Sequence, residues 1–350
     1  MTSQMATEIA AQPDTIAATL DALLPQRPAL RRLAEGRPHL LLIARGTSDN
    51  AAVYGRYLLE VHSGRGAALA APSLATHYAV QRDLSDTTVV SLSQSGSTEE
   101  IVQAQAWAAA CGAHTVAVTN VAGSPLALEA DLALVLRAGE EFAVPATKSY
   151  TAQLAAMAVI ADALGPPNRS LESTLHRVPA EVARLLADRG GVDDAIALLA
   201  STEHTLVSGR GLAFGTALEV ALKLEETCLE PVRGLSYADL RHGPIAVVDA
   251  ATATILVSAA DGPMASGMTE LARDVTTLGA RTIGIGGDSR FAATCEVPVA
   301  GPDLPETVAP LGLVVPAQVI VEGLARSRGL DPDAPRGLSK VTQTDRTPPG

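Results

Sequence analysis

The sequence predicts an α/β protein built from two tandem α/β sandwiches, each with a parallel sheet covered by helices on both faces. Short apolar runs that end in Gly, Ser or Asp are each followed by a longer helical pattern, as in buried parallel strands. This pattern occurs twice. The chain has 350 residues, 47% of them hydrophobic and 3% aromatic, so Ala, Val, Leu and Ile must form two sizeable cores.

The two copies are related by a constant offset of about 165 residues, the signature of an internal duplication. Three pairs of segments carry it: HLLLIARG at 39 and HTLVSGRG at 204, VVSLSQSG at 89 and ILVSAADG at 255, AHTVAVT at 113 and ARTIGIG at 280.

The predicted order is therefore a lead-in helix over 1–34, a first sandwich over 35–165 and a helical linker over 166–194. A second sandwich over 195–330 and a C-terminal loop or tail over 331–350 complete it. Ligands of open parallel sheets bind outside the carboxyl ends of the strands. In the first copy these ends precede Arg45–Asp49, Ser93–Thr98 and Asn120–Pro125.

Composition limits the partners. The formal net charge of −12 argues against nucleic acid, since binding a phosphate backbone needs a basic surface. Three cysteines without metal spacing indicate reduced thiols. The polar, acidic N-terminus does not look like a secretory leader, and no apolar run approaches the roughly 20 residues that cross a bilayer. We therefore expect a cytoplasmic protein with no membrane partner.

The loop Ser93-Gln94-Ser95-Gly96-Ser97-Thr98 lies between a predicted strand and a predicted helix. Gly96 permits a sharp turn, and the N–H groups at a helix start favour an anion. The preceding strand ends at Gly46-Thr47-Ser48, which is expected to close the same site. A Ser/Gly-rich helix cap without a ligand is the alternative. The equivalent loop of the second copy, Ser258–Pro263, has lost most hydroxyls and gained Asp261, an asymmetry that capping alone does not predict.

Seven motifs in order resemble the isomerase half of glucosamine-6-phosphate synthase and its free-standing deaminase-like relatives, a double sugar-isomerase (SIS) family. They are Gly46-Thr-Ser48, Ser93–Thr98, Ala146-Thr-Lys-Ser149, Ala217-Leu-Glu219, Ala221–Glu226, Arg241-His-Gly-Pro244 and Pro335–Lys340. The resemblance runs from Glu8 to Lys340 and implies two SIS-type sandwiches.

The resemblance also implies roles for single residues. Ser93, Gln94, Ser95 and Thr98 would hold a sugar phosphate, with Ser48 contacting the phosphate or the sugar. In the C-terminal half, Glu226 would be the base that moves a proton between C1 and C2.

Four further positions follow from the resemblance. Lys223 would assist at the sugar oxygens, and His242 would open the pyranose ring from the neighbouring subunit of a homodimer. Lys340 would lie on a loop that covers the substrate, where the matching lysine can form an imine, and the backbone of Val144 would line the pocket. Lys148 is expected to be structural.

Two features depart from the synthases. Arg45 stands where they have a Cys, and no glutaminase domain with its nucleophilic Cys precedes the SIS-like part. Aldose–ketose isomerisation needs only a ring-opening His near neutral pKa, a carboxylate base and cationic or hydrogen-bonding support, so neither metal nor organic cofactor is expected. Without the resemblance, a solvated ion pair is the favoured interpretation of Glu226 and Lys223, while His242 could order a turn and Lys340 could be a tail charge.

The leading functional hypothesis is an amino-sugar-phosphate deaminase/isomerase that converts glucosamine-6-phosphate to fructose-6-phosphate and ammonia without glutaminase activity. A lyase that dehydrates N-acetylglucosamine-6-phosphate by losing the C3 hydroxyl would use the same first step. A sugar-phosphate deglycase and a non-catalytic sugar-phosphate sensor remain further alternatives.

Overall fold

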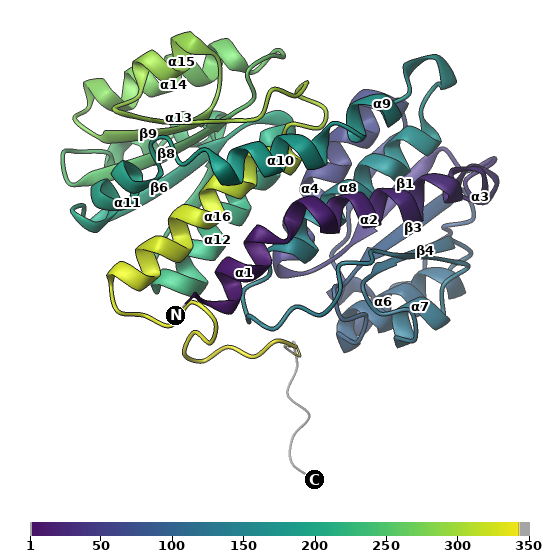
Figure 1. Cartoon of the computed structure of the whole chain (residues 1–350). Helices are drawn as coiled ribbons and strands as arrows, with labels where there is room; N and C mark the ends of the chain where they lie inside the picture. Colours follow the sequence, from purple (N-terminus) through teal and green to yellow (C-terminus); the bar gives the residue numbers. More distant parts are fainter. Residues whose placement is uncertain (1, 342, 344–350) are drawn as a thin grey trace. The chain divides into compact units, whose positions relative to one another are not determined.

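The computed structural model describes residues 2–341 and 343, which fall into two compact units (Figure 1). The N-terminal unit comprises Thr15–Glu140, Ala152–Ser173 and Ser339–Gly350. The C-terminal unit comprises Met1–Asp14, Glu141–Thr151 and Thr174–Leu338. The predicted tail is described only as far as residue 341 and at residue 343; its other residues lie outside the described part.

A five-stranded parallel sheet forms the centre of the N-terminal unit, in the order β2-β1-β3-β4-β5. Its strands are β1 (His39–Ile43), β2 (Ala67–Leu69), β3 (Thr87–Leu92), β4 (His114–Thr119) and β5 (Leu132–Val135). Every residue of the central strand β3 is buried, as expected for a strand covered on both faces.

Helices cover both faces of this sheet (Figure 1). Leu41, Val89 and Ala117 pack with α6 (Glu99–Ala110) and α7 (Pro125–Leu128) on one face. The other face is covered by α4 (Gly46–Leu58) and by the part of α8 (Lys148–Leu164) that belongs to this unit. Small connecting elements are the π-helical turn η2 (Leu59–Ser63), α5 (Ser73–Thr76) and η3 (Pro167–Arg169).

The C-terminal unit contains a second five-stranded parallel sheet, in the order β10-β9-β8-β6-β7. Its strands are β6 (His204–Gly209), β7 (Arg233–Ser236), β8 (Thr252–Ser258), β9 (Arg281–Gly286) and β10 (Val297–Val299). Alternate residues of β8 point to opposite faces, because a strand has a side-chain period of two. Ile255 and Val257 join a core with α11 (Val192–Ala200), α12 (Phe214–Cys228) and α16 (Pro310–Ser327). Leu256 joins a core with α14 (Ala265–Thr277) and α15 (Ser289–Thr294).

The predicted duplication is confirmed by the two sheets, since β1 to β5 and β6 to β10 are arranged in the same order. The two copies also agree in single backbone dihedral angles. After β1, Arg45 is extended (φ −144°, ψ 155°) and Gly46 has a φ of +54°, while after β6 Arg210 is extended (φ −151°, ψ 159°) and Gly211 has a φ of +60°. The fold class predicted from the sequence is therefore the observed one.

The N-terminal helical region differs from the expected single helix. It contains α1 (Gln4–Ala10), α2 (Gln12–Leu23), the 3-10 turn η1 (Leu24–Gln26) and α3 (Arg27–Leu33). Pro13, Pro25 and Pro28 each occupy the second position of a new segment, because proline lacks the N–H that a helix interior requires.

The linker is helical, as expected, with α9 (Glu172–Leu175) and α10 (Val178–Ala187). Two short elements, α13 (Tyr237–Arg241) and η5 (Pro244–Val247), follow β7. Within the described residues, no helix combines the length and the apolar character needed to cross a bilayer.

Candidate functional site

Two helix N-termini lie at the carboxyl edge of the N-terminal sheet. α4 begins at Gly46 after β1, and α6 begins at Glu99 after β3, and these two strands are hydrogen-bonded neighbours. Gly46, Thr47 and Ser48 thus form the first turn of α4, while Ser93–Thr98 form the loop that enters α6 with Thr98 as its N-cap. The positive ends of both helices favour an anion at this edge.

The Ser93–Thr98 loop requires glycine at position 96. Its φ is +62°, and a Cβ there would lie 2.1 Å from Ser124 Oγ and 2.8 Å from Thr119 Oγ1. The Gly96 N–H donates to Ser93 Oγ at 3.2 Å, and the Ser97 N–H donates to Ser95 Oγ at 3.2 Å. The loop is therefore a tightly closed turn that is held by its own hydroxyls.

We call the loop Ser93–Thr98 and the turn Gly46–Ser48 together the phosphate cradle. Two further contacts hold its backbone and Ser48 in place. The Gln94 carbonyl accepts from the Asn120 N–H at 3.0 Å, so the backbone of Gln94 is tied to the end of β4. Ser48 is buried, and its Oγ accepts from Gln153 Nε2 on α8 at 2.9 Å. Gln153 had not been singled out by sequence reasoning, because a glutamine inside a helix carries no motif.

The C-terminal segment contacts the same loop. Gln343 Oε1 accepts from the Glu99 N–H at 3.0 Å, and Gln343 Nε2 donates to the Ser97 carbonyl at 3.3 Å. Lys340, three residues earlier, is half-buried and belongs to the same unit as the loop. The structure thus brings the C-terminal segment and the predicted phosphate cradle together.

The equivalent loop of the second copy is acidic. Six residues separate β8 from α14, as many as separate β3 from α6. Asp261 in this loop accepts from the Glu306 N–H at 2.7 Å, and a Cβ on Gly262 would lie 2.1 Å from Glu306 Oε2. Burial and the neighbouring Asp261 raise the pKa of Glu306. Asp261 in this loop and Glu306 beside it both repel phosphate, which agrees with the asymmetry that the sequence predicts.

A buried charge cluster lies on α12 in the C-terminal unit. Lys223 is 1% exposed; its Nζ lies 3.6 Å from Glu219 Oε1 and donates to Glu226 Oε2. Glu219 is fully buried, while the Glu226 side chain is 24% exposed. Because positions three and four apart share one helical face, α12 places all three groups together. Glu226 alone is open enough to meet a ligand.

The charge state of Lys223 follows from its neighbours. Burial alone lowers the pKa of an ammonium, but the carboxylates of Glu219, Glu226 and Glu141 more than offset this effect. The pKa of Lys223 is therefore raised and the side chain stays protonated at neutral pH. A partly exposed carboxylate beside a fixed ammonium can take up and return a substrate proton while the lysine supports developing negative charge.

Two buried carboxylates, to which the sequence alone assigned no role, accept hydrogen bonds from the backbone on either side of Val144. Glu8 accepts from the Phe142 N–H, and Glu141 Oε1 accepts from the Thr147 and Ser149 N–H groups at 3.0 Å each. The Val144 N–H donates to the Asp333 carbonyl at 2.8 Å. The resemblance begins at Glu8, which was the available signal for that residue.

His242 is exposed and ends the short helix α13. Its N–H donates to the Ala238 carbonyl at 3.1 Å. Among the described residues, no hydrogen bond or ion pair links its ring to Lys223 or Glu226. Lys148 is buried and begins α8.

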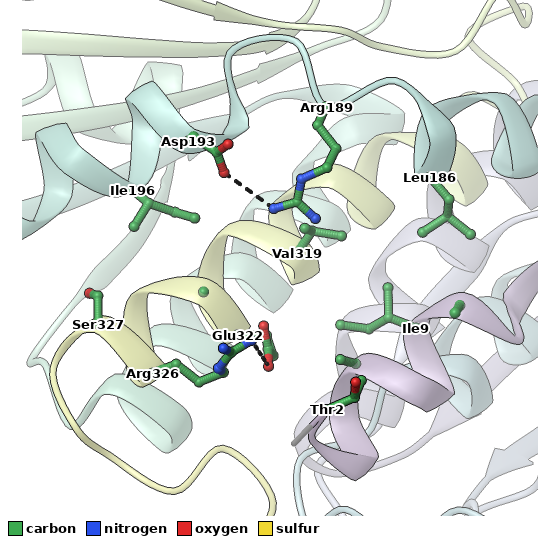
Figure 2. A pocket seen from close by; sticks show the side chains of 13 residues that line it. Thr2, Ile9, Leu186, Arg189, Asp193, Ile196, Val319, Glu322, Arg326 and Ser327 are labelled. Carbon is green, nitrogen blue, oxygen red and sulfur yellow. Dashed lines mark hydrogen bonds and ion pairs between the residues drawn. The ribbon is translucent and has the colours of Figure 1, made fainter.

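A separate cavity of about 630 Å³ lies in the C-terminal unit, between α1, α11 and α16 (Figure 2). Ile9, Ile196 and Val319 line it together with two ion pairs, Arg189–Asp193 at 3.3 Å and Arg326–Glu322 at 3.7 Å. None of the predicted site residues lines this cavity. In the described part of the chain, no three His, Cys, Asp or Glu side chains gather as metal ligands would.

Known proteins are similar to this chain along most of its length. The glutamine–fructose-6-phosphate aminotransferase [isomerizing] of Methanothermobacter thermautotrophicus is 33% identical over 314 residues, which are 87% of this chain and 52% of that protein. The protein of the same name from Pyrococcus horikoshii is 29% identical over 96% of this chain and 57% of its own length. This chain spans about half the length of the curated relatives that it matches.

Solved structures share the fold. A crystal structure described as a putative phosphosugar isomerase from Silicibacter pomeroyi has a TM-score of 0.86 and 28% identity, covering 95% of this chain and 100% of that one. A glucosamine-6-phosphate deaminase from Thermotoga maritima has a TM-score of 0.75 at 24% identity, covering 97% and 100%. Residues 33–163 match the SIS domain family. The part of the chain that holds the hydroxyl-rich loop is therefore a SIS domain.

Proposed function

We propose that this chain is an amino-sugar-phosphate isomerase that acts as a deaminase, converting glucosamine-6-phosphate to fructose-6-phosphate and ammonia. The phosphate would bind to Ser48, Ser93, Gln94, Ser95 and Thr98. Glu226 would act on C1 and C2 of the open-chain sugar.

The observation that carries the proposal is the α12 cluster. A solvated ion pair would leave both partners exposed, whereas Lys223 and Glu219 are withdrawn from solvent and Glu226 is only partly so. Burial of charged groups is costly and is typical of sites where chemistry needs a fixed protonation state. The hydroxyl-rich cradle, present in only one of two duplicated sheets, supplies a second and independent support.

The chemistry requires three proton movements. His242 transfers the ring proton and opens the pyranose to the aldehyde. Glu226 removes the proton from C2, giving an enolamine, and returns it to C1, which leaves an imine at C2. Water adds at C2, the C–N bond breaks, and ammonia leaves as the ketose forms. Lys223 stabilises the negative charge that develops on the sugar oxygen during proton removal.

The names of the similar proteins agree with this substrate class. The curated relatives are named for fructose-6-phosphate amination with isomerisation, and the Silicibacter structure for phosphosugar isomerisation. The isomerisation step that these names include does not itself consume glutamine.

Incubation of the purified chain with glucosamine-6-phosphate, followed by assays for ammonia and fructose-6-phosphate, tests the proposal. We expect equimolar products from the wild type and none from Glu226→Gln. The same reactions with N-acetylglucosamine-6-phosphate are analysed by mass spectrometry. Loss of water from the acetylated sugar, without ammonia from the free amine, would replace deamination by the lyase reaction. Wild-type protein that binds both sugars but turns over neither would indicate a sensor.

A homodimer with His242 acting on the neighbouring subunit's substrate is part of the proposal. Its support is the exposed position of His242 at the end of α13. An isologous two-fold dimer would place each histidine at the other site.

A further inference from the structure

Arg45 forms a two-pronged ion pair beside the predicted phosphate cradle. Its Nε donates to Glu100 Oε2 at 3.0 Å and its Nη2 donates to Glu100 Oε1 at 2.8 Å. The Glu100 side chain is 5% exposed and that of Arg45 is 44% exposed. Since Arg45 is the N-cap of α4 and Glu100 lies in the first turn of α6, this bidentate pair joins the two helix starts that form the cradle.

Two carboxylates lie in the helix turns that form the proposed phosphate site, and Arg45 is the cation beside them. Asp49 lies in the first turn of α4, and Glu100 lies in the first turn of α6. Carboxylates at these places suit an empty helix N-terminus, but they repel a phosphate dianion. Arg45 faces both: it binds Glu100 directly, and it opposes the effect of burial, which raises the pKa of Asp49.

The second copy of the fold shows that the pairing is not required by the backbone. Arg210 has the same extended conformation before a glycine of positive φ, yet its guanidinium stacks on the Tyr237 ring at 4.5 Å. The first turn of α14 begins with Ala265 and Ser266, neither of which is charged. The Arg–Glu clamp therefore occurs only in the copy that carries the hydroxyl-rich loop.

We infer that Arg45 is a positioning residue for the sugar phosphate: its ion pair neutralises Glu100 in the first turn of α6, so that the cradle accepts a dianion. The inference rests on the proposed function of the cradle. It assigns to Arg45 a role in substrate affinity. The proton transfer itself is left to Glu226.

The test measures binding of two non-reacting probes, inorganic phosphate and sorbitol-6-phosphate, by calorimetry on the full chain. Arg45→Met is expected to weaken both by about tenfold or more, because it removes the guanidinium that pairs with Glu100 and leaves the site more negative beside the anion. Adding Glu100→Gln to Arg45→Met is expected to restore most of the loss. Arg210→Met, the matched change in the second copy, is expected to bind both probes as the wild type does.

The outcomes separate this inference from the proposal beneath it. A wild type that binds neither probe would overturn the cradle and the role of Arg45 together. A wild type that binds, with Arg45→Met unchanged or with no rescue by Glu100→Gln, would overturn the role of Arg45 alone. Should Arg45→Met fail to fold, Glu100→Gln by itself decides: it removes a negative charge, so weaker binding of sorbitol-6-phosphate would contradict the inference and equal or tighter binding would support it.

Discussion

Replacing Lys223 with methionine tests whether the α12 cluster depends on a buried cation. The side chain of Lys223 is 2% exposed, that of Glu219 is fully buried, and Nζ lies 3.6 Å from Glu219 Oε1. Methionine keeps the volume of the apolar stem but removes the ammonium. Breaking a buried pair by removing one partner costs about 3–5 kcal/mol, since the remaining charge stays uncompensated. For a unit of this size, such a loss lowers the melting temperature by roughly 6–20 °C.

Differential scanning calorimetry of the full chain measures this effect. The double variant Lys223→Met, Glu219→Gln is expected to recover more than half of the loss, because it removes both charges. Arg281→Met serves as the matched control: it breaks the Arg281–Glu296 pair, whose side chains are 40% and 44% exposed, and should cost less than about 1 kcal/mol. A melting temperature of Lys223→Met within about 2 °C of the wild type would refute the reasoning.

Three further predictions follow from single sites. His62 is buried, its Nε2 has no hydrogen-bond partner, and burial lowers its pKa; the unfolded chain therefore takes up a proton that the folded chain refuses. The free energy of unfolding should fall as pH drops below about 6.5, measured by urea titration, and His62→Gln should lack this component. If His242 acts across a dimer, random mixing of Glu226→Gln and His242→Asn subunits should restore about a quarter of wild-type turnover, whereas action within one subunit restores none. Borohydride with fructose-6-phosphate should trap a covalent adduct in the wild type but not in Lys340→Arg; equal labelling of both would exclude the imine.

The sequence was sufficient to predict the fold because similar residues recur at the ends of corresponding strands in the two copies. Strands such as Thr87–Leu92 are buried on both faces, so no charged residue interrupts them, and the glycine after Arg45 and after Arg210 marks the turn into a helix. The break-up of the N-terminal helix was missed, although Pro13, Pro25 and Pro28 were visible. Proline is tolerated in a first turn, so its presence alone does not say where a helix restarts.

The site was predictable only where local spacing carries information. Lys223 and Glu226 lie three apart on one helix, so the sequence places them together. Glu141 and Gln153 contribute through contacts that depend on tertiary packing. Glu141 bonds to Ser149 and Gln153 bonds to Ser48 only once the chain has folded. No periodicity in the sequence predicts these contacts.

The central claim is that one six-carbon phosphate ester contacts both the Ser93–Thr98 loop and Glu226. A crystal structure of the Glu226→Gln variant with glucosamine-6-phosphate measures this directly. The account predicts phosphate oxygens within hydrogen-bonding distance of the Ser93, Ser95 and Thr98 hydroxyls, with C2 of the same molecule about 3–3.5 Å from the side chain at position 226. A phosphate bound elsewhere, or a sugar whose C1 and C2 both lie beyond the reach of that side chain, would contradict it.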